Sequence, residues 1–227
     1  MWIDDQVLME SHQDICLKTW VPGEAVVVLG RSNKRGTEAD RVLCDADAVA
    51  ILKRLGGGGT VILHDQCLVV SCGLWVRDYY KNDLYFRQMN QSIIDVFQTQ
   101  IPNTDFKQRG YSDIVLGDKK LVGTSLFRSR NFLLFQASIL VDPRVDLMDT
   151  YLQHPSLEPD YRQGRSHRDF VMGLAELSKL STLDWLLVFE QKLLGKIESR
   201  MAEELIASQE AQVTHVKSRI AEVRDLD

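Results

Sequence analysis

The sequence lacks the long apolar and basic segments that mark two large classes of protein. No apolar run approaches the roughly 20 residues that a helix needs to cross a bilayer. No long basic run offers a nucleic-acid footprint, and the formal net charge of −5 argues against a general binder of polyanions. The N-terminus, MWIDDQVLMESHQD, lacks the basic and apolar regions of a signal peptide. We therefore expect a cytoplasmic protein that binds neither nucleic acid nor membranes.

Cysteine is scarce and has no metal-binding spacing. The four cysteines, Cys16, Cys44, Cys67 and Cys72, contain no CxxC pair, and none lies in residues 73–227. In a strand, Cys67 and Cys72 would face opposite sides because they are an odd number of residues apart. We expect reduced, mostly buried thiols and no zinc site, while a nucleophilic cysteine stays open.

The remaining composition is that of an ordinary globular protein. Of the 227 residues, 44% are hydrophobic and 26% are charged, which argues against global disorder or low complexity. No internal repeat is visible in the sequence. A chain of this length can bury one large core or two small ones.

Four consecutive glycines, Gly56–Gly59, separate LKR from TVIL. Glycine loses the most backbone freedom on folding, so the run is unfavourable unless the backbone turns through positive φ or approaches something closely. We interpret DADAVAILKRL as a helix capped by Asp45 or Asp47, and TVIL as a strand. The glycines then form a helix-to-strand loop whose amides can hold an anion, with Lys53 and Arg54 beside it. A flexible turn is the alternative.

Hydrophobic patterning places most other elements. AVVVLG at 25–30 is expected to be a strand that leads into the polar loop RSNKRG, and TVIL is expected to form a hairpin with CLVVSCGLWV. DLYFRQMNQSIIDVFQTQI has the apolar stripe of a core-facing helix. SDIVL, KLVGTSLF and LLFQASILV predict three consecutive strands, the first two joined by a Gly-Asp turn. A short helix is expected from Pro143 to Leu152.

The C-terminal part of the chain is expected to be helical. Ser166 can cap a helix over HRDFVMGLAELSKL, and residues 181–225 are helical by propensity and spacing. Apolar positions thin out after Ile206, which favours a solvated or partner-facing last helix. The weak stripe that remains there consists of Val213, Val216, Ile220 and Val223.

The mixture of hairpins and helices favours an α+β fold with a mixed, mostly antiparallel sheet and packed helices. We divide the chain into a main domain at residues 1–180 and a C-terminal helical extension at 181–227.

Four motifs point to one family when they are set side by side: GRSN after a strand, KRLGGGGTVILHD, SDIVLGDKKLVGTS, and a strand containing FQAS. Together they resemble the lipoate-protein ligase and octanoyl transferase superfamily, which shares its catalytic fold with biotin protein ligase. The resemblance runs from about Val26 to Arg168. It implies that lipoic or octanoic acid is activated with ATP and Mg²⁺ as an acyl-adenylate and passed to a lysine of a lipoyl-acceptor domain.

The resemblance also implies roles for single residues. Lys120 matches the lysine that contacts the acyl carboxyl and the adenylate phosphate, and it is the expected catalytic residue. Asp113 matches an acidic residue near adenylate or metal, and Asn33 matches a polar residue near the adenine. The other matched positions, expected to bind substrate or nucleotide, are Arg54, Gly57, Gly58, Gly59, Gly123, Thr124, Gln136 and Ser138.

This sequence departs from the family pattern at three points. Gly56 replaces the usual Ser or Thr, and one residue is inserted before His64. Gln136 occupies a common histidine position, with Ala137 and Ser138 in place of Gly-Thr. Full-length ligases carry a small accessory domain, whereas this chain ends in helices, so a separate accessory chain is one option.

An acyl tail needs an apolar slot, for which the candidates are Val61, Leu63, Val70, Leu121 and Leu140.

Three functions compete for this sequence. The first is an ATP-dependent acyl-protein ligase, the second is a non-catalytic or partner-dependent module that binds the acyl group or nucleotide, and the third is an octanoyl or lipoyl transferase. Biotin ligation is a fourth, lesser alternative. The arginines of RQGRSHR face either an acidic acceptor domain or only solvent.

Overall fold

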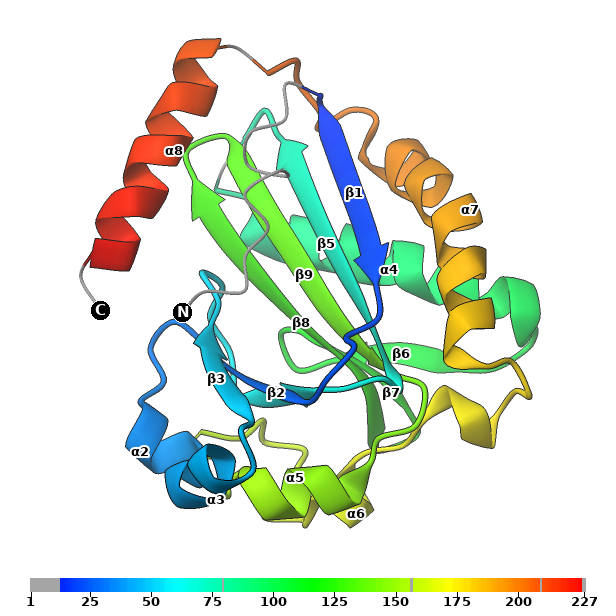
Figure 1. Ribbon diagram of the computed structural model, residues 1–227. Helices are drawn as coiled ribbons and strands as arrows, with labels where there is room; N and C mark the ends of the chain where they lie inside the picture. The colour runs from blue at the N-terminus through cyan, green and yellow to red at the C-terminus, as the bar shows by residue number, and fades with distance from the viewer. Residues whose placement is uncertain (1–12, 79, 156, 209, 226–227) are drawn as a thin grey trace.

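The structure is a computed structural model that describes residues 13–78, 80–155, 157–208 and 210–225. The predictions made on residues 1–12 lie outside this part of the chain. The described elements form a large sheet and a small sheet, and helices cover the large sheet on one face (Figure 1). The α+β prediction, with its mostly antiparallel sheet, is confirmed.

The large sheet is antiparallel throughout, in the order β1-β5-β9-β8-β7-β6. Its strands are β1 (Ile15–Trp20), β5 (Cys67–Trp75), β9 (Phe132–Leu140), β8 (Lys119–Ser129), β7 (Asp113–Leu116) and β6 (Phe106–Arg109). The three consecutive strands predicted after residue 111 are β7, β8 and β9. Gly117 stands at φ +62° in the turn between β7 and β8, a conformation that glycine adopts readily.

The small sheet contradicts two predictions made from the sequence. It consists of β3 (Ala50–Lys53), β2 (Val26–Leu29) and β4 (Val61–Leu63), with β2 and β3 parallel. DADAVAILKRL is therefore not one helix, because its second half pairs with β2 as β3. The β4 and β5 strands form no hairpin either, since they belong to different sheets.

The helix that was expected before the glycines is short. It is α3 (Arg41–Ala46), and Asp40 caps it by accepting a hydrogen bond from the Leu43 amide at 3.0 Å. Asp47 is its C-cap, so neither Asp45 nor Asp47 acts as the predicted N-cap. The chain then turns through Ala48 at φ +57°, which ends the helix. The glycines consequently connect two strands and not a helix and a strand.

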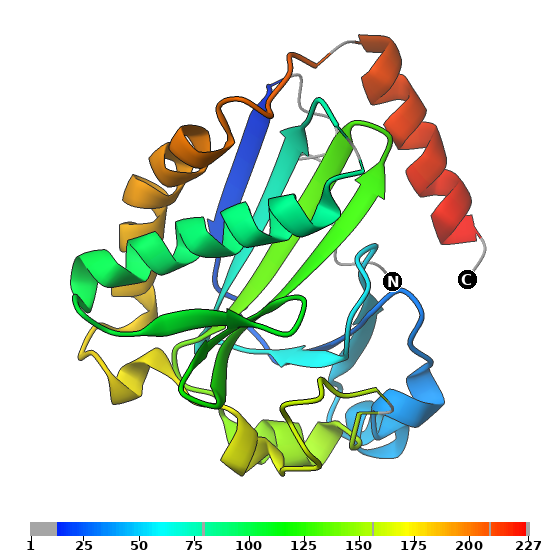
Figure 2. The ribbon, with the colours of Figure 1, turned by 180° about the vertical axis from the view of Figure 1, so that it is seen from behind.

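Two long helices cover one face of the large sheet. They are α4 (Asn82–Gln100), which confirms the predicted helix, and α7 (Thr182–Met201), and Figure 2 shows α4 lying across the strands. Phe97 of α4 contacts Trp185 and Phe189 of α7 at ring centroid distances of 5.8 and 5.7 Å. Val70 and Leu121 are buried in this same core. Their predicted place in an acyl slot is therefore wrong, because both belong to the helix-covered core.

Several short helices lie close together in the lower part of Figures 1 and 2. They are α2 (Arg35–Glu38), α5 (Val145–Tyr151) and α6 (His167–Phe170), together with α3. Ser166 caps α6 as predicted, by accepting a hydrogen bond from the Asp169 amide at 3.2 Å. The predicted continuation of this helix is wrong, since α6 ends at Phe170 and a 3-10 turn follows at Leu174–Glu176.

The last helix, α8 (Glu210–Asp225), was expected to be solvated or partner-facing, but its apolar stripe packs within the chain. Its stripe, Val213, Val216, Ile220 and Val223, is buried to at least 95%. These side chains pack with Leu55, Trp75, Phe127, Phe132 and Leu134, so α8 lies beside the β8–β9 hairpin (Figures 1 and 2). Four spaced aliphatic residues suffice here because the opposing surface is rich in aromatic rings.

A domain boundary between residues 180 and 181 stays a prediction, although α7 and α8 both pack on the sheet. In the part of the chain that the structure describes, no helix is both long and apolar enough to span a membrane.

Candidate functional site

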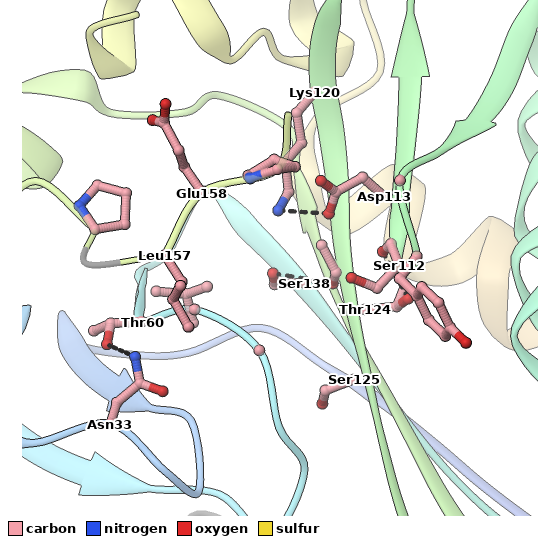
Figure 3. A pocket seen from close by; sticks show the side chains of 18 of the residues that line it. Asn33, Thr60, Ser112, Asp113, Lys120, Thr124, Ser125, Ser138, Leu157 and Glu158 are labelled. Atoms are coloured by element: carbon pink, nitrogen blue, oxygen red, sulfur yellow. Dashed lines mark hydrogen bonds and ion pairs between the residues drawn. The ribbon is translucent and has the colours of Figure 1, made fainter. Parts of the chain in front are cut away.

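A cavity of about 1170 Å³ opens between the two sheets and is closed on one side by residues 157–163 (Figure 3). It brings together nearly all of the residues predicted from the sequence. Those that line it are Asn33, Arg54, Gly58, Gly59, Asp113, Lys120, Gly123, Thr124, Gln136 and Ser138. Gly57 is the exception, because it lies outside the lining.

Strand register explains why the cavity face of the large sheet is polar. Asp113 on β7 pairs with Gly123 on β8, which pairs in turn with Ser138 on β9. Residues that are directly opposite across a sheet share a face. Ser125 and Gln136 form the next row on the same face, two residues along. The sequence alone gives none of these partnerships.

An irregularity in β8 directs Lys120 into the cavity. Ile114 pairs with Val122 but Val115 pairs with Lys120, so the β8 strand carries one extra residue against β7. Such a bulge re-aims a side chain that would otherwise point to the opposite face. The Lys120 side chain then lies over Gly123, where a Cβ would stand 3.0 Å from its Cε and Nζ atoms. The absence of a Cβ at Gly123 therefore leaves room for the lysine side chain in this position.

Lys120, Asp113 and Tyr161 form a connected group. The Lys120 Nζ atom lies 2.7 Å from Asp113 Oδ1, and the Tyr161 hydroxyl donates to Asp113 Oδ2 at 2.7 Å. Burial and the negative charge of Asp113 raise the pKa of Tyr161, so its phenol stays protonated and donates. Asp113 is thus held from both sides, and it orients the lysine.

Arg54 organises the glycine loop. Its Nη2 atom donates to the carbonyl oxygens of Gly57 and Gly59, both at 2.7 Å, and its Nη1 atom donates to Val28 at 3.3 Å. These bonds hold the loop against β2 and leave Gly58 at φ +92°. All of these acceptors are backbone carbonyl oxygens, so the Arg54 guanidinium holds the shape of the loop.

Gly56 explains one departure from the family pattern. A Cβ at this position would stand 2.7 Å from the Ser125 Oγ atom of β8. Real Cβ contacts are almost never that close, so Ser or Thr cannot stand here while Ser125 faces it. The amide of Arg31 also donates to the Gly56 carbonyl at 3.0 Å, which ties the loop to the end of β2.

The cavity has an apolar floor and a smaller annex. Val28, Leu63 and Val69 line the main cavity and pack together across the two sheets. The annex, a hollow of about 90 Å³ that shares Val61, Lys120 and Phe170 with the main cavity, is lined further by Ile62, Leu140, Met148, Leu152 and Val171. The predicted slot residues Val61, Leu63 and Leu140 therefore border these spaces. Val69 takes the place predicted for its neighbour Val70.

Sequence reasoning missed Glu38 as a cavity residue. Its side chain is almost fully buried and borders both the cavity and the annex. Thr60 donates to the Glu38 Oε2 atom at 3.3 Å and accepts from Asn33 Nδ2 at 3.4 Å. The helix α2 that carries Glu38 has only four residues, too few for a periodic pattern to mark the inward position.

No cysteine lines the cavity or its annex among the described residues. Burial raises the pKa of Cys67 to about 12 and also raises the pKa of Cys72. The Cys67 Sγ atom lies 3.2 Å from His64 Nε2, a pairing closed off from the cavity. The Gln66 amide donates to His64 Nδ1 at 3.2 Å, so the neutral ring carries its proton on Nε2 and does not activate the thiol as a base. This geometry disfavours a cysteine nucleophile.

His64 should make the fold sensitive to acid. Burial lowers its pKa in the folded protein below the unfolded value of about 6.5, so its contribution to stability is present above that pH and is lost as the pH falls. We expect the melting temperature to drop between about pH 7.5 and about pH 5.5. The drop should be smaller in His64→Asn, whose amide can accept from Gln66 without becoming charged. Equal pH dependence of both proteins by differential scanning calorimetry would contradict this assignment.

The described residues form no cluster of three or more His, Cys, Asp or Glu that could hold a metal ion. Both oxygens of Asp113 are already engaged by Lys120 and Tyr161. Mg²⁺ at nucleotide sites is usually held by one or two carboxylates and by phosphate oxygens. Among the described residues, the cavity lining holds four carboxylates, those of Glu38, Asp113, Glu158 and Asp160, but they form no complete protein cage for this ion.

Three curated relatives resemble the chain. Over 178 residues it is 26% identical to lipoate-protein ligase A of Psychrobacter cryohalolentis, covering 78% of this chain and 49% of that one. It is 27% identical to lipoate-protein ligase 2 of Staphylococcus aureus, covering 56% of this chain and 36% of that one. It is 25% identical to an inactive lipoate-protein ligase 2 of Plasmodium falciparum, covering 65% of this chain and 47% of that one. The chain thus spans about half, or less, of the length of these relatives.

Solved structures with lower sequence identity share the fold. A Thermoplasma acidophilum protein with bound lipoic acid has a TM-score of 0.71 at 16% identity, over 96% of this chain and 87% of that one. A bi-partite lipoate protein ligase from the same organism has a TM-score of 0.69 at 16% identity, over 90% and 78%. A lipoate-protein ligase A bound with ATP has a TM-score of 0.67 at 18% identity, over 90% of this chain and 80% of that one. The sequence model of the lipoyl protein ligase A/B catalytic domain matches residues 2–193, and the chain therefore belongs to that family.

Proposed function

We propose that this domain activates lipoate or octanoate with ATP as an acyl-adenylate and transfers the acyl group to a lysine of a lipoyl-acceptor domain. The observation that carries the proposal is the convergence of Lys120, Gly58, Gly59 and an apolar floor on one cavity. An acid with an aliphatic tail needs a positive group at its carboxylate and a dry surface along its chain. Burying each CH₂ contributes about 0.8 kcal/mol, which favours such an acid over a polar one.

Lys120 is the residue proposed to act on the reacting atoms. Its ammonium group would stabilise the negative charge that develops when the carboxylate attacks the α-phosphorus. The ion pair with Asp113, at 2.7 Å, holds that group in place before the substrates arrive. Preorganised charge of this kind costs little reorganisation during the reaction.

The other lining residues are proposed to hold the substrates. Asn33, Thr124, Gln136 and Ser138 offer hydrogen-bonding groups on opposite walls of the cavity, and the glycine loop, kept in shape by Arg54, offers backbone amides. Mg²⁺ would neutralise charge on the ATP phosphates, and Asp113 is its proposed protein contact. Gly57 can act only through the shape of the loop.

The acceptor of the acyl group is proposed from the family and from one neighbour. The T. acidophilum ligase is described as bi-partite, and an E2 lipoyl domain is described together with it. We propose a lipoyl domain as the acceptor for this chain and a separate accessory chain as a partner. A cytoplasmic location stays a prediction from the sequence.

The experiment is to incubate the purified chain with ATP, Mg²⁺ and lipoate, and to measure pyrophosphate release and protein-bound acyl-AMP. Addition of a lipoyl domain then tests transfer by the mass increase of that domain. We expect adenylate formation with lipoate and octanoate and none with acetate, which has no tail for the apolar floor. Equal reaction with acetate, or no pyrophosphate with any acid, would reject the proposal.

A binding module without catalysis is the second candidate. It is favoured by the similarity to the inactive lipoate-protein ligase 2 of P. falciparum. This candidate predicts tight binding of lipoate or ATP by calorimetry without release of pyrophosphate. A transferase that uses a cysteine is disfavoured because the described lining residues contain no thiol.

A further inference from the structure

Arg162 carries a buried charge whose hydrogen-bonding capacity is only partly used. Its side chain is 93% buried, and its guanidinium carbon lies 4.8 Å above the centre of the Phe170 ring. The Nε atom donates to the Arg165 carbonyl at 3.0 Å and lies 3.5 Å from Glu158 Oε2. The Nη2 atom is buried and has no hydrogen-bond partner among the described residues.

Arg165 is the natural comparison, because it stacks on the same ring at 5.4 Å. Its Nη1 atom donates to Asp118 Oδ2 at 2.9 Å, and its Nη2 atom donates to the carbonyl oxygens of Asp118 and Tyr161 at 3.0 and 2.9 Å. Its Nε atom donates to the Arg162 carbonyl at 3.0 Å. Every nitrogen of Arg165 therefore has a partner within the fold. Arg162 and Arg165 thus stack on the same ring, but only Arg162 has a buried nitrogen, Nη2, without a hydrogen-bond partner among the described residues.

The position of Arg162 shows which space its unpartnered Nη2 atom borders. Arg162 lines both the main cavity and the annex, as do Lys120 and Glu38, whereas Arg165 lines neither. A buried donor that is left without a partner costs about 1 to 3 kcal/mol, and more when it is charged. Native proteins rarely keep such groups without a reason, and a ligand is one common reason.

Lys120 does not make this second cation redundant. The charge of its ammonium group is already shared with Asp113 at 2.7 Å, whereas the carboxylate beside Arg162, that of Glu158, lies at a longer 3.5 Å. A guanidinium that is stacked on a ring keeps a fixed orientation, and its planar fork suits the two oxygens of a carboxylate or phosphate. Burial lowers the pKa of Arg162 from the usual arginine value, but arginine remains charged in proteins.

We propose that Arg162 is a substrate-binding residue that receives an anionic oxygen of the ligand, from the acid's carboxylate or a nucleotide phosphate, where the annex meets the main cavity. This inference rests on the proposed function, since it names the residue that holds one of its substrates. It differs from the family's lysine contact, because it assigns a second cation from the loop between α5 and α6.

The test compares charged and neutral ligands on Arg162→Met, which keeps an aliphatic stem against Phe170 but removes all five N-H donors. The titrations use octanoate against octanamide, and ATP with Mg²⁺ against adenosine, by isothermal calorimetry. We expect at least one anion to bind about tenfold or more weakly, the loss typical of a charged hydrogen bond, while its neutral counterpart is unchanged. The anion that is affected tells carboxylate from phosphate.

Arg165→Met is the matched control. It removes an arginine from the same ring but not a free donor, so its melting temperature should fall while the affinity for both anions is kept. If Arg162→Met binds octanoate and ATP as the wild type does, or weakens charged and neutral ligands equally, the assignment is overturned and Arg162 is structural. If the wild type binds neither anion, the proposed function fails as well, and the two failures are thus distinguishable.

Discussion

Replacing Lys120 by alanine should lower the rate of acyl-adenylate formation by about 10²- to 10³-fold, the usual loss when a preorganised group at a developing charge is removed. The substituted chain would keep its apolar floor and glycine loop, so binding of the acid should weaken far less than turnover. The measurement is pyrophosphate release under single-turnover conditions, together with calorimetric titration of octanoate. A rate within about threefold of the wild type would contradict the role of Lys120.

Two controls separate catalysis from folding in this experiment. Lys119→Ala changes the neighbouring lysine on β8, which does not line the cavity, and its rate should match the wild type. Lys120→Ala also leaves the buried Asp113 without its charged partner, so a loss of stability is expected. The double variant Lys120→Met with Asp113→Asn removes both charges, and its Asn side-chain oxygen can still accept the hydrogen bond from the Tyr161 hydroxyl. It should recover stability without recovering activity.

Gly30→Ala should destabilise the protein by about 3 kcal/mol, at the upper end of the usual range for overpacking, and should displace the glycine loop. Its Cβ would overlap the Gly58 carbonyl oxygen and would stand 2.8 Å from the Asn33 Oδ1 atom. The obstructing atom is backbone, which cannot rotate away as a side chain can. The loop is fixed from behind by Arg54, so the strain falls on the cavity wall.

Chemical denaturation and ligand titration together measure this effect. The Gly30→Ala protein should unfold at lower denaturant concentration and should bind ATP more weakly, because Gly58 and Asn33 both line the cavity. Gly23→Ala is the matched control, since a Cβ at that position meets nothing within 4 Å. If Gly30→Ala were as stable as Gly23→Ala and bound ATP normally, the two loops would not be packed as described.

Local patterns predicted the elements that depend on neighbours in sequence. The composition of SDIVL, KLVGTSLF and LLFQASILV predicted three strands because each run is rich in β-branched and aliphatic residues and is followed or preceded by turn residues. The i, i+3, i+7 stripe predicted α4 for the same local reason. By contrast, AILK was assigned to a helix although it forms β3, because a run of three aliphatic residues fits either period and only the pairing of Ile51 with Val27 decides between them.

The sequence by itself determined the fold class, because that follows from residue type and short-range spacing. Its motifs, through their resemblance to a family, also pointed to ten of the residues that line the cavity. Tertiary structure decided which way side chains point. The pairing of β8 with β7 skips one residue and turns Lys120 into the cavity, and the register of β5 puts Val69 there instead of Val70. It also brought Tyr161 and Arg162 of a distant loop to Asp113 and the annex, and it buried the sparse stripe of α8 under an aromatic surface. Pairing register and burial both depend on a partner remote in the chain, so no local pattern could have given them.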